Sequence, residues 1–353
     1  MKKSIISIIS FFLLISLLNL NLIFSSAENL ENNTLYVDDD SDHDWYDSTH
    51  FRSIQDAIDN SSDKDTILIY DGQYFEKIII NKPLNLLGSN NSNIFSNETE
   101  KSDIILIYSE NTTIQNMNIY YTNLSRKTTG ISIHSKNTII KNCNFLHCGF
   151  GIISRFENNK IINCSFNQNT NGIKIYSSNN TNISNCQIEN STSRGLIIEG
   201  SKNSVVTKNC FKNNYYGLSI EAIIFPSIPE EPGPPPIKSY DNLIYLCNFF
   251  NNTEQTYISL YSDNNQFDNG TFGNYWDNYN GTDEDFDGIG DITFIISESN
   301  LYDKYPLIEP YKEEPINLID EDDLLYSLLI GVIISVIFLV PLGIYFRKKY
   351  LKY

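Results

Sequence analysis

Basic residues are few in this sequence. Its 353 residues include 25 Lys+Arg against 43 Asp+Glu, which gives a formal net charge of -18 at pH 7. A protein that binds nucleic-acid phosphates needs a basic stripe, so this balance argues against DNA or RNA as a partner. A chain of this charge attracts cations instead.

Helix formers such as alanine are scarce, and only 19% of the residues are charged. Aromatic residues reach 13%, with 23 Tyr and 20 Phe, and Asn, Ile and Ser recur throughout. Because aromatic and β-branched side chains favour strands, the composition favours a β protein with a polar surface over a helical protein.

The first 27 residues are predicted to be a signal peptide. A basic start at residues 2–3 precedes an apolar run over 5–24, and small residues at 25–27 supply a cleavage site. The alternative is a retained amphiphilic helix. Cleavage would leave a mature chain that starts near Glu28.

Residues 324–346 contain no charged residue. A helix rises ~1.5 Å per residue, so this segment is long enough to cover the ~30 Å hydrocarbon core of a bilayer. An acidic stalk at 312–323 precedes it and a basic tail at 347–353 follows it, so the positive-inside rule places the tail in the cytoplasm. The pattern predicts a single-pass type I protein of the cell membrane with an extracellular ectodomain; the alternative is a buried core helix.

A repeated motif, Ile-x-Asn-Cys-x-Phe, dominates the middle of the chain. Clear copies lie at 140–145, 161–166, 183–188 and 244–249, with an earlier copy at 114–119 and a displaced one at 206–211. A second element begins at Gly130, Gly151, Gly172, Gly195 and Gly217, with spacings of 21, 21, 23 and 22 residues. Apolar and polar residues alternate in both elements, as in half-buried strands, and we expect Asn or Gly at each corner.

Repeats of about this length with short strands predict a parallel β-helix, whose coils stack ~4.8 Å apart. We expect an all-β single domain over 34–271 with about ten coils of 21–23 residues. A short helix within 53–60 is expected to plug one end, and residues 272–311 are expected to cap the other. A proline-rich insertion at 221–240 interrupts the repeat and predicts an extended polyproline arm, with Leu218 aligned to Ile258.

Six cysteines in an exported chain suggest disulfides, a metal site or buried thiols. Cys143, Cys164, Cys186 and Cys247 share one position of the repeat, two residues before an inward Phe or Ile. Side chains two apart on a strand face the same way, so we expect a ladder of thiols lining the core.

Several segments resemble NosD-type right-handed parallel β-helix proteins of the pectin-lyase-like group, which carry PbH1 repeats. The opening of these proteins is matched by residues 36–40, 53–58, 71–74 and 80–88, and their ending by 273–276, 283–291 and 303–307. The resemblance covers nearly all of 34–311. It implies the architecture without a single activity, because the group includes copper-related maturation proteins, polysaccharide lyases and epimerases, and surface proteins of no assigned activity.

The resemblance to NosD proteins also implies copper as a ligand. Copper requires soft or imidazole ligands, and the mature chain offers His43, His50, His134, His147 and Met117 without a clustered motif. Copper binding is therefore not expected. An enzyme of the group would need paired carboxylates, or a basic residue near metal-binding Asp, on one outer face. No recurrent acidic pair stands out beside the arginines of the clear coils.

A candidate calcium loop lies near the C-terminal end of the repeat domain. Carboxylates alternate at Asp283, Asp285 and Asp287, Ile289 stands at the seventh position, and Asp291 at the ninth. The bidentate Glu of a complete EF-hand loop is missing, so weak Ca²⁺ binding is expected; the alternative is a solvated acidic turn. A second acidic run at 38–44 is interpreted as a solvated loop.

Aromatic residues near the insertion and the C-terminal cap suggest a stacking platform for sugar rings. They are Tyr215, Tyr216, Tyr257, Tyr261, Tyr275 and Trp276. Packing of the cap is the alternative, and for Trp276 it is the favoured interpretation.

Together these patterns predict a membrane-anchored cell-surface β-helix that binds carbohydrate or envelope partners without catalysis. Sequons such as those at Asn111, Asn123 and Asn251 permit glycosylation. Two alternatives stay open, a polysaccharide lyase, hydrolase or epimerase and a copper-handling protein.

Overall fold

The computed structural model describes residues 33–89, 91–96, 103–122, 128–226, 233–297 and 301–312. All of these except Lys312 belong to one compact unit, residues 1–311. The predicted signal peptide and the predicted span at 324–346 lie outside the described residues. In the part of the chain that is described, no helix is long and apolar enough to cross a bilayer.

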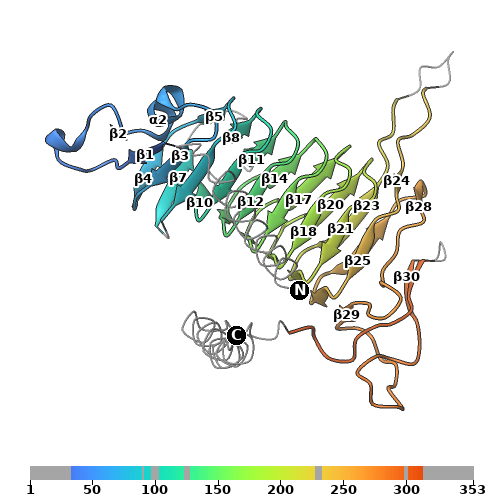
Figure 1. Ribbon diagram of the computed structural model, residues 1–353. Helices are drawn as coiled ribbons and strands as arrows, with labels where there is room; N and C mark the ends of the chain where they lie inside the picture. The colour runs from blue at the N-terminus through green and yellow to red at the C-terminus, as the bar shows by residue number, and fades with distance from the viewer. Residues whose placement is uncertain are drawn as a thin grey trace, which may run out of the picture. The chain divides into compact units, whose positions relative to one another are not determined.

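The unit is a parallel β-solenoid whose strands form three sheets (Figure 1). Neighbours in the first sheet are, in order, β2 (His50–Phe51), β1 (Thr34–Val37), β3 (Thr66–Ile69), β6 (Asn85–Gly88), β9 (Thr113–Gln115), β12 (Ile139–Lys141), β15 (Lys160–Ile162), β18 (Asn182–Ser184), β21 (Val205–Thr207) and β25 (Leu243–Tyr245).

The second sheet contains β29 (Tyr275–Trp276), β26 (Asn248–Phe250), β22 (Cys210–Lys212), β19 (Gln187–Glu189), β16 (Ser165–Asn167), β13 (Asn144–Leu146), β10 (Asn118–Tyr121), β7 (Ser92–Ser96) and β4 (Gly72–Phe75). The third sheet contains β27 (Glu254–Ile258), β23 (Tyr216–Glu221), β20 (Arg194–Glu199), β17 (Asn171–Tyr176), β14 (Phe150–Ser154), β11 (Thr129–Ile133), β8 (Asp103–Ile107) and β5 (Ile78–Ile80). Each complete coil contributes one strand to every sheet, so the 8-stranded third sheet corresponds to eight complete coils rather than the expected ten or so.

The repeat motif predicted the corners correctly. Asn142, Asn163 and Asn185 have φ angles of 53°, 51° and 57°. Asparagine tolerates this left-handed conformation better than most residues because its short side chain bonds locally. An Asn therefore turns the chain from the first sheet into the second on these coils, and Lys208 and Leu246 adopt the same conformation at this corner of the last two.

The glycine column has a different role from the expected corner. Gly172 lies inside β17, and a Cβ atom added there would stand 2.5 Å from the carbonyl oxygen of Gly195 on the next coil. The same close approach recurs from Gly130 to Gly217. Adjacent coils can stack at this position only without a side chain.

The predicted thiol ladder is confirmed in position. Cys143, Cys164, Cys186 and Cys247 are buried with free thiols, and each Sγ lies 3.3–3.5 Å from the carbonyl oxygen two residues earlier. In the displaced copy, Gln187 pairs with Cys210, so Asn209 takes the place of the thiol. Its buried amide accepts a hydrogen bond from the Cys186 N–H at 2.8 Å and donates to the Ile183 carbonyl at 2.8 Å.

The N-terminal end is plugged by α2 (Ile54–Asn60), as expected. Ser53 caps its first turn, and the Glu76 carboxylate accepts hydrogen bonds from the Ile54 and Gln55 N–H groups at 2.8 and 2.9 Å. At the other end, the Lys82 ammonium donates to the carbonyls of Ile58, Asp59 and Ser61 at 2.6–3.0 Å. Both charges oppose the partial charges of the helix ends. The loop before α2 contains η1 (His43–Trp45).

The C-terminal end is closed by a cap that contains β30 (Phe294–Ser297) and β31 (Leu301–Asp303). The buried Asp303 carboxylate accepts hydrogen bonds from Trp276 Nε1 at 2.9 Å, from the Asn274 N–H at 2.7 Å and from the Tyr305 N–H at 3.1 Å. Burial raises the pKa of Asp303 to about 6. This residue joins 273–276 to 303–307, two of the three segments that resemble the NosD ending.

The insertion leaves after β23 and returns to β24 (Ser239–Tyr240), which pairs with β28 (Ser262–Asp263) (Figure 1). An antiparallel bridge between Ile223 and Ile237 joins the two sides of this projecting arm. The expected alignment across it shifts by two residues, because Leu218 pairs with Thr256 and Ile220 with Ile258.

Candidate functional site

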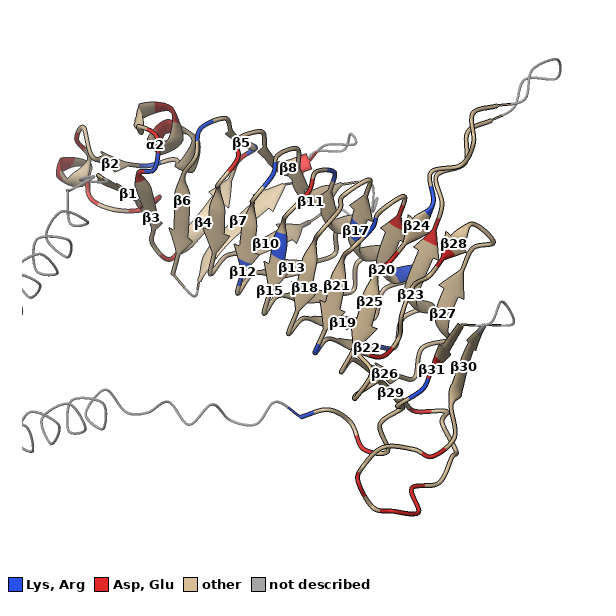
Figure 2. Ribbon diagram, turned by 45° about the vertical axis from the view of Figure 1, so that its right-hand side comes forward, with Lys and Arg blue, Asp and Glu red and all other residues tan. Residues whose placement is uncertain are grey.

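The outer face of the third sheet differs from the outer faces of the other two sheets in the length of its strands and in its side chains. Its central strands β17, β20 and β23 are each 6 residues long, whereas most strands of the other sheets have 3 or 4. We call the outer surface of β8, β11, β14, β17, β20, β23 and β27, with the residue that follows each strand, the third-sheet face. Basic and acidic residues lie close together on it (Figure 2).

One column of this face carries most of its polar chemistry. Strand register places Tyr176, Glu199 and Glu221 side by side on successive coils. On earlier coils the same column continues through Arg155 and His134 to Tyr108, whose ring stacks on the imidazole at 5.1 Å between centroids. Burial, and then the nearby Arg155 guanidinium, lower the pKa of His134, so this imidazole is neutral at pH 7.

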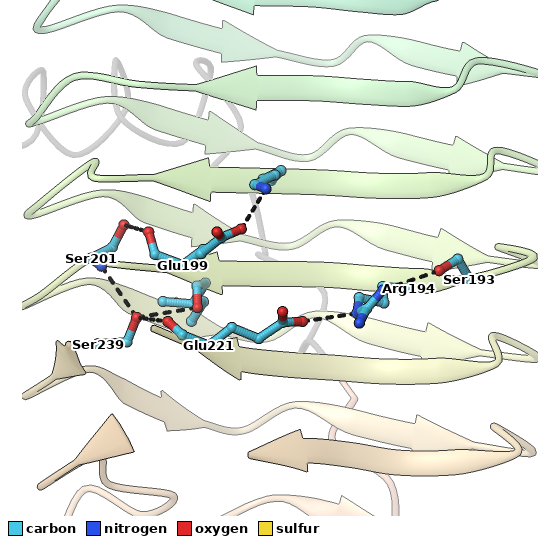
Figure 3. A network of polar contacts seen from close by, with 8 residues as sticks. Ser193, Arg194, Glu199, Ser201, Glu221 and Ser239 are labelled. Atoms are coloured by element: carbon cyan, nitrogen blue, oxygen red, sulfur yellow. Dashed lines mark hydrogen bonds and ion pairs between the residues drawn. The ribbon is translucent and has the colours of Figure 1, made fainter. Parts of the chain in front are cut away.

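Two ion pairs cross the face between neighbouring coils. Lys174 contacts Glu199, and Arg194 Nε lies 2.9 Å from Glu221 Oε1 (Figure 3). The four side chains are only 19–30% exposed. Because Glu199 and Glu221 are adjacent register partners, their like charges would repel without these two cations.

Aromatic rings accompany both cations. The Lys174 ammonium lies 5.1 Å from the centroid of the Tyr176 ring, and the Arg194 guanidinium 5.6 Å from that of Tyr216. Between the paired charges, Ser219 is fully buried on β23, and its hydroxyl has no hydrogen-bond partner within the described residues.

The structure divides the predicted aromatic platform. Tyr215 and Tyr257 are 49% and 42% exposed, and their rings lie 4.8 and 5.5 Å from that of Tyr216 between them. Tyr261 is also exposed, after β27. These four tyrosines belong to the third sheet or its edge.

Tyr275 and Trp276 lie elsewhere, on β29 of the second sheet. Tyr275 contacts Phe250, whereas Trp276 is 1% exposed and stacks between Phe249 and Phe294 in the core. Trp276 is therefore a packing residue of the cap. It does not belong to the exposed platform in which the sequence had placed it.

The ion-paired column is not among the sites predicted from the sequence. Its signal is a repeated Gly-Leu-x-Ile-Glu at 195–199 and 217–221, which ends each copy on a carboxylate. Recognising the pair requires the coil-to-coil register, because Glu199 and Glu221 are 22 residues apart in the chain and neighbours only in the sheet.

The predicted calcium loop bends at Gly288, whose φ of 85° lies in the left-handed region. Oxygen atoms of Asp283, Asp285 and Asp287 lie within 4.8 Å of one another. Repulsion by Asp287 is the main cause that raises the pKa of Asp285. Asp285, Asp287, Ile289 and Asp291 line one cleft of about 420 Å³.

A second, polar cleft of about 790 Å³ adjoins the loop and shares Gly270 and Lys304 with the first. It is lined by Asp263, Gln266 and Tyr302 among others. At the N-terminal end, carboxylate oxygens of Asp38, Asp39 and Asp40 also lie within 4.8 Å of one another.

Comparison with known proteins gives the family. Residues 58–281 match the family described as Periplasmic copper-binding protein (NosD), which is more than half of the chain. The chain belongs to the NosD family. The right-handed β-helix that the sequence resemblance implied is thereby confirmed. None of the curated proteins compared with this NosD-family chain matches it.

Several solved structures match the chain at low sequence identity. The alginate lyase from Paenibacillus sp. str. FPU-7 is 13% identical, with a TM-score of 0.46, over 57% of this chain and 76% of the lyase. The Dettilon tailspike protein is 14% identical, with a TM-score of 0.47, over 63% and 51%. The pectin methylesterase PemA from Erwinia chrysanthemi is 13% identical, with a TM-score of 0.42, over 64% and 80%. At this level of similarity the three proteins give no information on the activity of the NosD-family chain.

The donor groups of this NosD-family protein do not fit a copper site. His50 is bonded to Asp47, His134 is stacked on Tyr108 and His147 contacts Gln168, each at a different place in the solenoid. Within the described ranges, the groups of three His, Cys, Asp or Glu that could hold a metal are the two aspartate clusters. Carboxylates suit hard cations rather than copper, and the thiol ladder is buried.

Proposed function

We propose that this NosD-family protein binds glycans non-catalytically through the third-sheet face. The observation that carries the proposal is the position of Tyr216, whose ring contacts the exposed Tyr215 and Tyr257 on one side and the ion-paired Arg194 on the other. Tyrosine offers a flat apolar face for a sugar ring together with a hydroxyl that hydrogen-bonds. The strands of the face repeat with each coil, which gives an extended surface along which a chain of sugars can lie.

The proposal includes display at the cell surface as a single-pass type I membrane protein. The sequence of residues 1–27 supports export, and the uncharged segment 324–346 with its basic tail supports anchoring with the solenoid outside. Labelling of intact cells with an impermeant reagent, compared with lysed cells, tests this arrangement. A solenoid labelled only after lysis would contradict it.

A glycan array probed with the full-length protein in detergent micelles tests the binding function. We expect a hit that the variant Tyr216→Ala/Tyr257→Ala weakens at least tenfold. The matched control is Phe95→Ala/Tyr120→Ala, which removes two stacked rings from the outer face of the second sheet and should leave binding unchanged. Equal weakening by both variants, or no hit on the array, would count against the proposal.

A polysaccharide lyase, hydrolase or epimerase is the second candidate, because Glu199 and Glu221 form a carboxylate pair on one face. Such an enzyme turns over its substrate. Incubation of the protein with acidic and neutral polysaccharides, followed by ultraviolet absorbance and reducing ends, detects lyase or hydrolase activity; NMR of the products detects epimerisation. Activity that disappears in Glu199→Gln would show that the third-sheet face is catalytic, and the proposed non-catalytic function would then be replaced. A titration with copper addresses the third alternative, which the positions of the imidazoles and thiols do not favour.

A further inference from the structure

We infer that Glu199 and Glu221 restrict the third-sheet face to neutral glycans, because they occupy the cations that a uronic-acid chain would need. This inference rests on the proposed glycan binding and names its ligand class. It makes the two glutamates specificity-determining residues of the face.

Both cations at the centre of the face are already neutralised. Lys174 is held by Glu199 and Arg194 by Glu221, and the four side chains are largely buried. A carboxylate of a ligand would have to displace a glutamate from a partly desolvated pair, which leaves that glutamate without a partner. The exchange gains no net ion pair, so a uronate has no advantage over a hydroxyl.

Each of the two cations also contacts a tyrosine ring of the protein. The ammonium of Lys174 and the guanidinium of Arg194 each lie within 6 Å of a tyrosine ring centroid on the same face. A cation over a ring is attracted to its negative face. Each cation therefore has a carboxylate and a ring from its own chain.

The charge balance around the face points the same way. Its strands carry the carboxylates of Asp103, Glu199, Glu221 and Glu254 and the cations of Lys174 and Arg194, and Arg155 follows β14. Among the described residues Arg155 is the cation of this face with no carboxylate partner; it donates to Ser132 Oγ at 3.2 Å. With a whole-chain charge of -18, a polyanion is repelled at long range as well.

The groups that remain available suit neutral sugars. Tyr215 and Tyr257 present exposed rings, and His134 is neutral and can exchange hydrogen bonds with hydroxyls.

The test measures affinities of the full-length protein in detergent for five hexasaccharides. Cellohexaose, xylohexaose and mannohexaose are neutral, whereas hexagalacturonate and hexamannuronate are acidic. We expect at least one neutral hexasaccharide to bind at least tenfold more tightly than both acidic ones at 0.15 M NaCl.

The decisive variant is Glu199→Gln/Glu221→Gln, which releases both cations and keeps the side-chain shapes. We expect its affinity for an acidic hexasaccharide to rise at least tenfold and to fall again at 0.5 M NaCl, with neutral binding changed less than threefold. Glu157→Gln is the matched control, because it breaks the exposed ion pair with Lys136 at a corner of the coil. It should change neither affinity.

The possible results are separable. A wild-type protein that prefers an acidic hexasaccharide overturns the inference and leaves glycan binding standing, as does a folded double variant that gains no acidic binding. If the double variant does not fold, as judged by circular dichroism, the single variants Glu199→Gln and Glu221→Gln and the wild-type preference decide the question. No binding to any of the five hexasaccharides removes the proposed function and the inference with it.

Discussion

At the scale of single residues, the positions that resemble NosD proteins serve to close the solenoid. Asp39 accepts a hydrogen bond from the Gln73 N–H at 3.2 Å, and a Cβ on Gly72 would stand 2.1 Å from Asp39 Oδ1. At the other end, Asp303 binds the Asn274 N–H and the Trp276 indole. These motifs therefore lie at the two ends of the solenoid, whereas the third-sheet face is built from the repeats between them.

Asp303 gives the cap a pH dependence. Its pKa is about 6 in the folded protein against 3.8 for an exposed carboxyl, so protonation favours the folded state. The stabilisation from this group is complete below pH 4 and is lost as the pH rises through 6. For a shift of this size, the free energy of unfolding falls by ~3 kcal/mol at most. Chemical denaturation at pH 4 and pH 6.5 should show this loss in the wild type but not in Asp303→Asn.

The comparison of the two proteins cancels the contributions of the other carboxylates. Glu309→Gln, at an exposed carboxyl near the end of the cap, is the control and should follow the wild type. An Asp303→Asn protein with the same pH profile as the wild type would show that the carboxyl is already ionised at low pH. Because the variant loses one acceptor oxygen, its stability at any single pH is expected to be lower.

At the scale of elements, local patterns predicted short structures and missed contacts between coils. The short amphipathic run within 53–60 indicated α2, and the corner asparagines indicated the turns. The pair of Glu199 and Glu221 follows the 22-residue spacing of their strands, but Lys174 and Arg194 stand elsewhere along neighbouring strands, so the two ion pairs could not be assigned from spacing. Coil lengths vary, and the insertion after Glu221 shifts the register by two residues, which explains the overestimated number of coils. The burial of Trp276 depends on Phe294 and Asp303, which arrive from the distant cap.

The acidic loop at 283–291 is the element for which a ligand is predicted. Three of its carboxylates converge, and Ca²⁺ would relieve the repulsion that raises the pKa of Asp285. If the dissociation constant is ~1 mM, 10 mM Ca²⁺ adds about 1.4 kcal/mol of stability. For a domain of this size that corresponds to an increase of roughly 2–5 °C in Tm. Differential scanning calorimetry with and without Ca²⁺ measures it.

The variant Asp285→Ala/Asp287→Ala should abolish the increase. Asp38→Ala/Asp40→Ala, in the acidic run at the opposite end, is the matched control and should keep it. A Tm that does not change with millimolar Ca²⁺ in the wild type removes the prediction. An increase that persists in the loop variant would move the site to another part of the chain.

At the scale of the whole molecule, the solenoid is a one-dimensional stack in which each coil contacts only its neighbours. Its stability is then close to a sum of coil and interface contributions, and the register between coils matters more than their number. Lys160 pairs with Asn182 and Ile161 with Ile183, so residues 161–182 make up one complete coil. Removing them joins Lys160 to Ile183 with every inward side chain still inward.

We expect the protein that lacks 161–182 to fold, with cooperative thermal unfolding and a Tm within about 10 °C of the parent protein. Deletion of 161–181 is the matched control. It removes one residue fewer and therefore places Ile183 on the outer side at the junction. This second protein should aggregate or lose its cooperative transition, as measured by circular dichroism and size-exclusion chromatography. If the two deletions behave alike, the coil register does not determine the fold, and the side-by-side placement of Glu199 and Glu221 loses its structural basis.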